Sequence, residues 1–332
     1  MKTVAIIGAG SWGTALAIVL APRFPQVRLW VYEPDLAARM RESRENDVYL
    51  PGFSVPANVE ITNRLAQALE DADAVLSVMP SHLVRRLYEQ MAPLLTDRML
   101  FVSATKGLEI ENLLRPSDII TEVLSARFAP RVAVLSGPTF AREVAALSPT
   151  ALVVASPDPE LNACIQAAFS SSSFRLYTSL DPVGVEIGGS IKNVVAIGAG
   201  VLAGMGLGHN PMAALITRGL AEMTRLAVAL GGKVQTLSGL AGLGDLVLTC
   251  TGELSRNRAV GMELARGRKL EEIVGSMKMV AEGVKTTNAA VELARRYSVE
   301  MPITEQMYQM LHFDLAPREA VRRLMERSLK GE

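Results

Sequence analysis

The feature that most constrains this chain is a glycine pattern placed between a strand-like segment and a helix-like segment. The apolar residues 3–7 predict a buried strand, and Gly8, Gly10 and Gly13 follow them in the spacing G-x-G-x-x-G. In such a turn the first glycine permits the tight bend, the second lets a pyrophosphate approach the backbone, and the third lets the helix pack closely on the strand. The helix N-terminus offers free N–H groups to phosphates. The pattern predicts a dinucleotide-binding turn, with a turn that serves packing alone as the alternative.

A dinucleotide-binding unit requires a second strand that ends in an acidic residue, and the sequence contains both. Residues 27–32 predict the strand, and Glu33 lies 20 positions after Gly13, the spacing expected of a carboxylate that binds the adenosine ribose. Tyr32 directly precedes it. The alternative for Glu33 is an ordinary acidic residue at a helix start, because Pro34 follows.

Composition predicts a globular protein without nucleic-acid or metal partners. The chain has 332 residues, which favours two domains, and 49% of them are hydrophobic. With 34 basic and 34 acidic residues the formal net charge is +0, so no global field attracts nucleic acid. Cys164 and Cys250 lie far apart, and the three histidines share no i, i+4 spacing. We therefore expect no metal site and no disulfide framework.

Two uncharged stretches imitate membrane segments. Residues 4–22 follow Lys2 as a signal peptide would, but the dinucleotide turn accounts for their glycines. Residues 193–217 are also without formal charge, and residues 209–211 interrupt them. We interpret the second stretch as a buried, glycine-rich core helix and its following turn. The sequence therefore predicts a cytoplasmic protein with no integral membrane segment.

Short apolar runs alternate with helical patterns over residues 1–181. Such alternation predicts a doubly wound Rossmann-type sheet of buried parallel strands. Helical patterns cover 34–45 and 116–128. Beyond the first two strands, the expected strands are residues 74–79, 99–102, 132–135 and 151–154, with a last one at 176–178.

Helical periodicity dominates after residue 181. We therefore expect a dinucleotide-binding domain at 1–181 and a mainly α-helical substrate domain at 182–332. A glycine cluster at 204–208 has no strand before it, so we interpret it as close packing or a helix end rather than a phosphate turn. The expected helices are 183–201, 213–230, 258–266, 282–296, 303–311 and 317–329.

One lysine stands out in the second domain. Lys192 interrupts an otherwise apolar helix, and burial lowers the pKa of an ammonium group toward neutrality, where it can serve as an acid or base. Gly188 and Gly189, one turn earlier, remove side chains and would let a ligand lie against the helix. The alternative is a lysine that extends to solvent or pairs with Glu186 or Asp181.

A polar stretch further along the chain suits phosphate recognition. Asp245 lies in a glycine-rich segment that we expect to be a flexible turn, and Ser255, Arg256 and Asn257 follow. The planar fork of an arginine beside hydroxyl and amide donors is suited to a phosphate. A solvated surface loop is the alternative.

Two loops at predicted strand ends add further candidates. Lys106 follows one strand at the edge where α/β sheets bind ligands. Gly137 and Thr139 flank Pro138 after the next strand, where we expect a helix with proline at its first position and hence a second potential anion site.

Taken together, these segments resemble the bacterial NAD(P)-dependent glycerol-3-phosphate dehydrogenases over nearly the whole chain. The run LAGLGDLVLTCT followed by SRNR is highly specific for that family. The segments that carry the resemblance are GAGSWGTALA at 8–17, ATKGLE at 104–109, SGPTFA at 136–141, SIKNVVAIGAG at 190–200, LITRGLAEM at 215–223, LAGLGDLVLTCTGELSRNR at 240–258, EGVKT at 282–286 and VEMPIT at 299–304.

The resemblance implies a role for each matching residue. Lys192 would donate and accept the proton. The substrate would be bound by Lys106, Gly137, Thr139, Lys192, Asp245, Ser255, Arg256 and Asn257. The cofactor would be bound by Ser11, Trp12, Lys106, Ala141, Arg256, Val280 and Glu282, together with the glycines of the turn, Tyr32 and Glu33.

The activity that the resemblance implies is the reversible reduction of dihydroxyacetone phosphate to sn-glycerol 3-phosphate with NAD(P)H, for phospholipid synthesis. A homodimer is implied as well. Family members often carry Arg or His after the second strand, where this chain has Tyr32 and Glu33, so the preference between NADH and NADPH stays open.

Two alternatives remain. A β-hydroxyacid dehydrogenase would pair the helix lysine with an asparagine one turn later, but position 196 is Ala. A non-catalytic dinucleotide sensor would need no buried proton donor.

Overall fold

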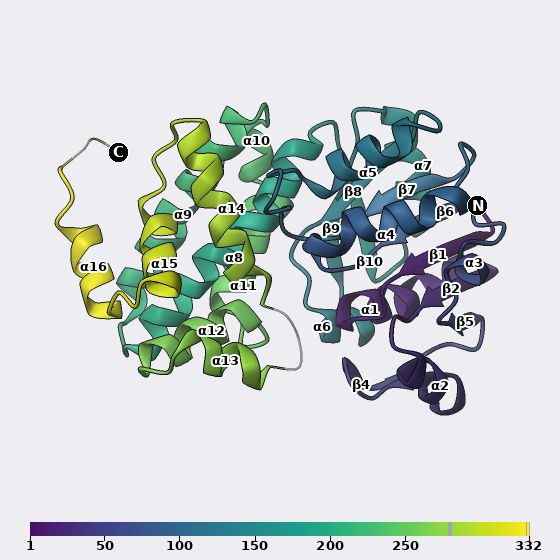
Figure 1. Cartoon of the computed structure of the whole chain (residues 1–332), viewed down its shortest axis with the longest axis horizontal. Coiled ribbons are helices and arrows are strands. Elements are labelled where there is room, and N and C mark those ends of the chain that lie inside the picture. The colour runs from purple at the N-terminus through teal and green to yellow at the C-terminus, as the bar shows by residue number, and fades with distance from the viewer. Residues whose placement is uncertain (278–280, 330, 332) are drawn as a thin grey trace.

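The first 181 residues fold around one sheet, which occupies the right half of Figure 1. The computed structural model describes residues 1–277, 281–329 and 331. Among these, the sheet has eight strands in the order β10-β9-β8-β7-β6-β1-β2-β5. Its strands are β1 (Thr3–Ile7), β2 (Gln26–Trp30), β5 (Val59–Thr62), β6 (Ala74–Ser77), β7 (Leu100–Ser103), β8 (Arg131–Ser136), β9 (Thr150–Ala155) and β10 (Phe174–Ser179).

Helices cover both faces of this sheet because strand side chains alternate between the faces. Val4 and Ile6 of β1 point to one hydrophobic core, and Ala5 and Ile7 point to another. The predicted doubly wound arrangement is confirmed. The first face carries α1 (Ser11–Leu20), α2 (Pro34–Ser43), α6 (Ala141–Ala145) and α7 (Pro159–Phe169), and the second carries α3 (Leu65–Leu69), α4 (Val84–Met91) and α5 (Pro116–Ser125).

The prediction of parallel pairing throughout is wrong at one junction. β8 and β9 pair antiparallel, whereas β9 and β10 are parallel. A parallel neighbour requires a crossover that spans the sheet. The short helix α6 between β8 and β9 packs against α1 instead, so the chain re-enters the sheet in the opposite direction.

Three short strands had no counterpart in the sequence predictions. β5 lies at the sheet edge beside β2, and β3 (Glu45–Asn46) pairs antiparallel with β4 (Leu50–Ser54) in a separate ribbon. β4 contains Pro51 and Gly52, two residues that are depleted in strands, so the apolar pattern there is weak.

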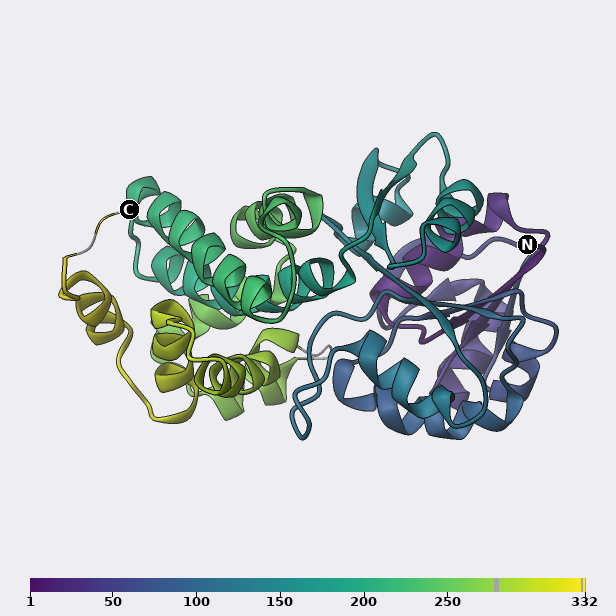
Figure 2. The ribbon, with the colours of Figure 1, turned by 90° about the horizontal axis from the view of Figure 1, so that it is seen from above.

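The second part of the chain forms the mainly helical lobe that the sequence predicts, and Figure 2 shows it beside the sheet lobe. A π-helical turn, η4 (Leu240–Gly244), replaces the flexible turn expected before Asp245. The helices are α8 (Pro182–Gly204), α9 (His209–Ala229), α10 (Val234–Leu237), α11 (Asp245–Thr251), α12 (Arg256–Ala265), α13 (Leu270–Ser276), α14 (Glu282–Arg296), α15 (Pro302–His312) and α16 (Pro317–Met325).

Helix α8 is the core of the helical lobe. In the described part of the chain it is the helix long and apolar enough to cross a membrane, but 89% of its apolar window is buried inside the protein. A Cβ on Gly200 would lie 1.9 Å from the carbonyl oxygen of Arg258, so the glycine lets α12 pack directly on α8. The burial identifies α8 as the predicted core helix.

The end of α8 differs slightly from the prediction. The helix stops at Gly204, and Gly206 has a φ of +71°, so the glycine cluster is a helix end as expected. His209 to Pro211 do not form the interruption. They form the first turn of α9. We propose residues 1–181 and 182–332 as the two domains, since β10 ends and α8 begins at this point.

Candidate active site

A cleft of about 760 Å³ runs from the carboxyl ends of the parallel strands to the helical lobe. One end is lined by Trp30 and Glu33, and the other by Lys192 and Asn257. The carboxyl edge of a doubly wound sheet is where such folds bind ligands. The cleft therefore brings the glycine turn and the candidate proton donor into one space.

The three glycines of the turn have the geometry that the pattern predicts. Gly8 has a φ of +116°, and a Cβ there would lie 2.4 Å from the carbonyl oxygen of Val78. A Cβ on Gly13 would lie 1.8 Å from the carbonyl oxygen of Gly8, so helix and strand pack too closely for a side chain. Gly10 faces open space, which leaves room for a pyrophosphate at the start of α1.

The residues beside the turn fit a dinucleotide. Ser11 and Trp12 form the first turn of α1 and line the cleft with Ala141. Trp12 Nε1 is buried and has no hydrogen-bond partner among the described residues. A buried donor of this kind requires an acceptor, and a bound phosphate or ribose oxygen would supply one.

At the far end of the cleft, Glu33 does not cap the helix that follows it. It occupies the residue before α2, but its side chain makes no capping hydrogen bond. Instead Glu33 Oε1 accepts a hydrogen bond from the Tyr49 hydroxyl at 2.7 Å, and this bond raises the pKa of Tyr49 to about 12. Tyr32, 69% exposed, also lines the cleft, and its ring lies edge-on to that of Trp30 at a centroid distance of 6.0 Å. No sequence pattern singled out Tyr49.

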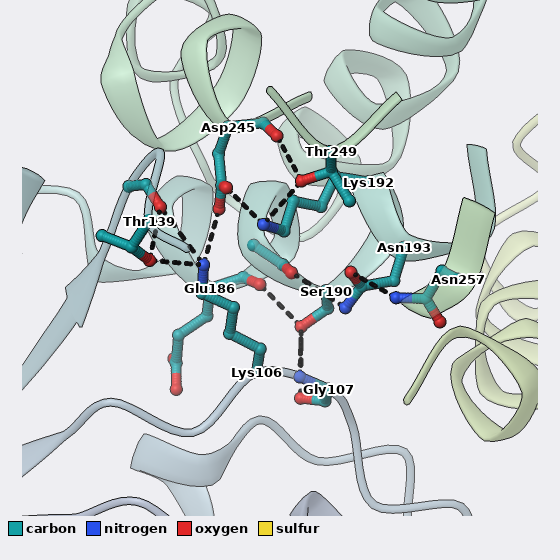
Figure 3. Close-up of polar contacts among 12 residues, drawn as sticks. Lys106, Gly107, Thr139, Glu186, Ser190, Lys192, Asn193, Asp245, Thr249 and Asn257 are labelled. Atoms are coloured by element: carbon teal, nitrogen blue, oxygen red, sulfur yellow. Dashed lines mark hydrogen bonds and ion pairs between the residues drawn. The ribbon is translucent and has the colours of Figure 1, made fainter. Parts of the chain in front are cut away.

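The centre of the site is a carboxylate held between two ammonium groups (Figure 3). Asp245 is fully buried, and its Oδ2 accepts from Lys106 Nζ at 2.8 Å. Its Oδ1 accepts from Lys192 Nζ, which also donates to Thr249 Oγ1 at 3.0 Å. Lys106 comes from the sheet lobe and the other residues from the helical lobe, so the cluster joins the two.

The alternative partners considered for Lys192 are engaged elsewhere. Glu186 pairs with Arg115 at 2.9 Å, and Asp181 caps α8 by accepting from the Gly184 N–H at 2.8 Å. Lys192 is only 4% exposed, and burial, reinforced by the charge of Lys106, holds its pKa below the usual range. The predicted direction of that shift is confirmed, and the alternative in which Lys192 extends to solvent or pairs with Glu186 or Asp181 is excluded.

Gly188 and Gly189 do not open space for a ligand, contrary to the sequence interpretation. A Cβ on Gly188 would lie 2.6 Å from the carbonyl oxygen of Ala241, and one on Gly189 would lie 2.6 Å from Ser136 Oγ. Both glycines let neighbouring segments pack against α8. The site therefore owes its shape to close packing at these two positions.

The loop after β8 contributes through its backbone as well as its side chains. Lys106 Nζ donates to the carbonyl oxygen of Gly137 at 3.2 Å and to Thr139 Oγ1 at 3.5 Å. The expected helix with Pro138 at its first position is absent, because α6 begins only at Ala141 and is five residues long. The φ of Gly137 is +155°, and its Cα approaches Leu152 too closely for a side chain, so the chain turns sharply here instead of entering a helix.

The polar stretch before α12 is not a solvated loop. Ser255 is 4% exposed and caps α12 by accepting from the Arg258 N–H at 3.2 Å. Asn257 is buried and donates to Asn193 Oδ1 at 2.9 Å, while its own Oδ1 accepts from the Gly283 N–H at 2.9 Å. Arg256 lines the cleft at the same helix start.

Two residues of this centre were not among the predicted site residues. Thr249 lies one helical turn after Asp245, a spacing that places both side chains on one face of α11. Asn193 lies next to Lys192 and bonds to Asn257. The helical spacing could have identified Thr249 in advance, whereas only the fold shows the Asn193 contact.

The last predicted cofactor residues lie near the start of α14. Glu282 accepts a hydrogen bond from Ser81 Oγ at 3.3 Å, and burial raises its pKa to about 7. Val280, also a predicted cofactor residue, lies outside the described residues. Among the described residues, no group of three His, Cys, Asp or Glu side chains is placed to hold a metal ion.

Comparisons with known proteins agree on one family. A family model described as NAD-dependent glycerol-3-phosphate dehydrogenase N-terminus matches residues 3–162, and the corresponding C-terminus model matches residues 181–322. A Koribacter versatilis protein named glycerol-3-phosphate dehydrogenase [NAD(P)+] is 57% identical over 98% of each chain. A Geobacter sp. (strain M21) protein of the same name is 54% identical over 100% of this chain and 99% of its own.

A solved structure agrees with these sequence matches. The crystal structure of glycerol-3-phosphate dehydrogenase from Coxiella burnetii superposes with a TM-score of 0.94 at 41% identity. The match covers 98% of this chain and 99% of that one. The two-lobed architecture is therefore shared over the whole length.

Proposed function

Because the chain belongs to the NAD-dependent glycerol-3-phosphate dehydrogenase family, we propose that its cleft catalyses the reversible reduction of dihydroxyacetone phosphate to sn-glycerol 3-phosphate with NAD(P)H. The observation that carries the mechanism is the buried pair of Lys192 and Asp245 inside the cleft. A non-catalytic sensor would gain nothing from a buried ammonium group.

The cofactor would be held along the sheet edge. The α1 N-terminus and the open face of Gly10 would take the pyrophosphate, with Trp12 Nε1 as a further donor. Tyr32 and Glu33 would hold the adenosine end, and Lys106, Ala141, Arg256 and Glu282 the remainder. When bound, the nicotinamide supplies or accepts the hydride at the carbon that carries the reacting oxygen.

Lys192 is the proton donor in this proposal. In the reduction its ammonium group protonates the oxygen that becomes the hydroxyl, and in the oxidation the neutral amine accepts that proton. Asp245 and Thr249 hold Nζ in place through the contacts described above. Lys106 adds a second positive charge beside the developing alkoxide, the form of electrostatic stabilisation that costs no reorganisation during the reaction.

The phosphate of the substrate would be held at the start of α12. Arg256 offers a fork of N–H donors, and Ser255 and Asn257 orient the same turn. Gly137 and Thr139 would contact the substrate from the sheet lobe. This arrangement fixes the phosphate at one end and the carbonyl near Lys192 at the other.

Cellular role and assembly are further parts of the proposal. We propose that the enzyme supplies glycerol phosphate for phospholipid synthesis and works in the cytoplasm, since its long apolar helix is buried in its own core. The resemblance supports a homodimer, and sedimentation velocity over a range of protein concentrations tests that assembly. A species with the mass of one chain at all concentrations would contradict it.

The decisive experiment follows NAD(P)H absorbance after addition of dihydroxyacetone phosphate. We expect oxidation of the cofactor and formation of sn-glycerol 3-phosphate, with no oxidation when a 3-oxo acid replaces the substrate. Turnover of the 3-oxo acid instead would support the β-hydroxyacid dehydrogenase alternative.

A further inference from the structure

The adenosine end of the cleft contains a carboxylate whose position is fixed by a neighbour. Tyr49, in the turn between β3 and β4, donates to Glu33 Oε1 at 2.7 Å. Both residues line the cleft and both are partly buried. A carboxylate fixed in this way can accept a hydrogen bond from the 2′-hydroxyl of a ribose, but it repels a phosphate attached to that 2′ oxygen.

Most arginines near this end are committed to other partners. Arg28 is buried and pairs with Glu60 at 3.3 Å, and Arg39 pairs with Asp47 at 3.1 Å. Arg142 lies over the Phe53 ring at 5.3 Å and donates to the carbonyl oxygen of Pro51. Arg41 is exposed on α2 and does not line the cleft. None of these four offers a free guanidinium to the adenosine end.

Arg86 is the exception. It lies on α4 and lines the cleft together with Leu87 and Gln90 of the same helix face and with Leu83, which directly precedes the helix. Its side chain is exposed, and it makes no hydrogen bond or ion pair with another described residue. Leu87, the next residue of α4, belongs to the same hydrophobic cluster as Trp30, which lines the cleft near Glu33. The uncommitted guanidinium of Arg86 therefore belongs to the helix that borders this end of the cleft.

We propose that Arg86 binds the 2′-phosphate of NADP(H), and that Glu33, positioned by Tyr49, binds the 2′-hydroxyl of NAD(H). The two groups favour opposite cofactors, because guanidinium attracts a phosphate dianion and carboxylate repels it. The enzyme therefore binds both cofactors. This inference rests on the proposed function only in that the cleft binds a nicotinamide dinucleotide.

Binding, measured without turnover, tests the assignment. Isothermal titration of the full chain with NADP⁺ and with NAD⁺ gives both dissociation constants. For Arg86→Gln we expect the Kd of NADP⁺ to rise about 10-fold, the effect of losing one charge-assisted contact at an exposed site, and the Kd of NAD⁺ to stay within about 2-fold. The Kd of adenosine 2′,5′-bisphosphate should rise by the same factor as that of NADP⁺, and the Kd of 5′-AMP should not rise.

Glu33 gives the opposite change. Glu33→Gln removes the repulsion, so NADP⁺ should bind more tightly and NAD⁺ less tightly than in the wild type. Tyr49→Phe should shift the ratio of the two constants in the same direction by a smaller factor, because the carboxylate remains but is no longer held. Arg98→Gln is the matched control: it removes the same charge from an exposed residue just before β7, outside the cleft lining.

Three results would overturn the proposal. If Arg86→Gln raised the Kd of NADP⁺ and that of NAD⁺ equally, Arg86 would bind the adenosine that both cofactors share. If neither Kd changed, Arg86 would not belong to the site. Loss of NADP⁺ affinity in Arg41→Gln or Arg142→Gln, with Arg86→Gln unaffected, would move the phosphate to another arginine. Failure of the wild type to reduce dihydroxyacetone phosphate would reject the proposed function alone, since the nucleotide titrations do not depend on that substrate.

Discussion

At the scale of single residues, the site depends on how one carboxylate is shared. Asp245 accepts hydrogen bonds from both Lys106 and Lys192, and its side chain is the most deeply buried of the three. A buried carboxylate of this kind needs partners, since an unpaired charge in the interior is costly. Because Lys106 remains when Lys192 is replaced, a substitution at Lys192 can remove the proton donor without leaving Asp245 unpaired.

Lys192→Met should abolish most turnover and leave cofactor binding intact. A positioned general acid contributes about 10²–10⁴-fold to rate, so kcat should fall by that order while the Kd of NADH changes little. Stopped-flow turnover and NADH fluorescence titration measure the two quantities. Lys233→Met, at an exposed lysine, is the control. A kcat within a few-fold of the wild type would remove Lys192 from the mechanism.

The pH dependence should follow the protonation of Lys192. Reduction needs the ammonium form and oxidation the neutral amine, so kcat/KM for reduction should fall as pH rises through the lowered pKa, and that for oxidation should rise. The charge of Asp245 raises the pKa of Lys192 against the effect of burial. In Asp245→Asn, the fall of kcat/KM for reduction with rising pH should therefore occur at lower pH than in the wild type. The residual activity of the variant is used to measure this profile. A fall displaced to higher pH would contradict the assignment.

Arg256→Lys should weaken recognition of the phosphate. A lysine keeps the charge but cannot reproduce the planar fork of an arginine, so KM for dihydroxyacetone phosphate should rise. Dihydroxyacetone has no phosphate, and kcat/KM for it should change far less. Steady-state kinetics with the two substrates decide the point: equal losses for both would show that Arg256 does not anchor the phosphate.

At the scale of elements, a side chain of one helix caps another. Glu222 of α9 is 1% exposed and accepts from the N–H groups of Ile303 and Thr304, at 2.6 and 3.1 Å, in the first turn of α15. α15 has no side-chain cap of its own. Burial raises the pKa of Glu222 to about 7. The folded state thus holds this proton more strongly than the unfolded chain, whose carboxyl has the ordinary value.

This shift predicts a pH-dependent stability. A raised carboxyl pKa adds stability below the unfolded value, and that contribution is lost as pH rises through the folded value. Relative to Glu222→Gln, the wild type should therefore lose up to about 3 kcal/mol of unfolding free energy between pH 4.5 and 7. Urea denaturation of both proteins across this range measures it. A difference that does not vary with pH would show that Glu222 titrates normally.

At the scale of the whole molecule, polar contacts bind the two lobes into one unit. Glu186 of α8 pairs with Arg115 at 2.9 Å and accepts from the Ser117 N–H, also at 2.9 Å, at the start of α5. Nearby, Ser190 Oγ accepts from the Gly107 N–H at 3.0 Å. Because Glu186 and Ser190 are buried where α8 meets the sheet lobe, neither lobe can unfold without exposing them.

Glu186→Ala should destabilise both lobes together. The substitution leaves the Ser117 N–H and one N–H of Arg115 without their acceptor, while Arg115 keeps its pair with Asp118 at 2.6 Å, so the cost should be about 1–3 kcal/mol. Differential scanning calorimetry should show one transition in the wild type and one displaced transition in the variant. Glu319→Ala, which removes a surface pair with Arg322, should shift the midpoint little. A variant that unfolds in two separate steps, with one at the wild-type temperature, would contradict the coupling.

The sequence alone determined the features that depend on neighbours along the chain. The turn at Gly8, the alternation of strands and helices, and the core helix around Lys192 follow from local backbone freedom and from apolar periodicity, which act over a few residues. The family resemblance added the matching of site residues, and Asp245 was singled out on both grounds.

Only the tertiary structure decided which distant residues meet. Lys192 pairs with Asp245 rather than with Glu186, which is nearer in sequence, because η4 and α11 pack against α8. The absence of a side chain at Gly188 permits this close packing. Tyr49 reaches Glu33 through a ribbon that has no strong local pattern. β9 reverses direction because α6 packs on α1. These contacts depend on how whole elements pack, and residues far apart in sequence carry no local signal of the partner that packing gives them.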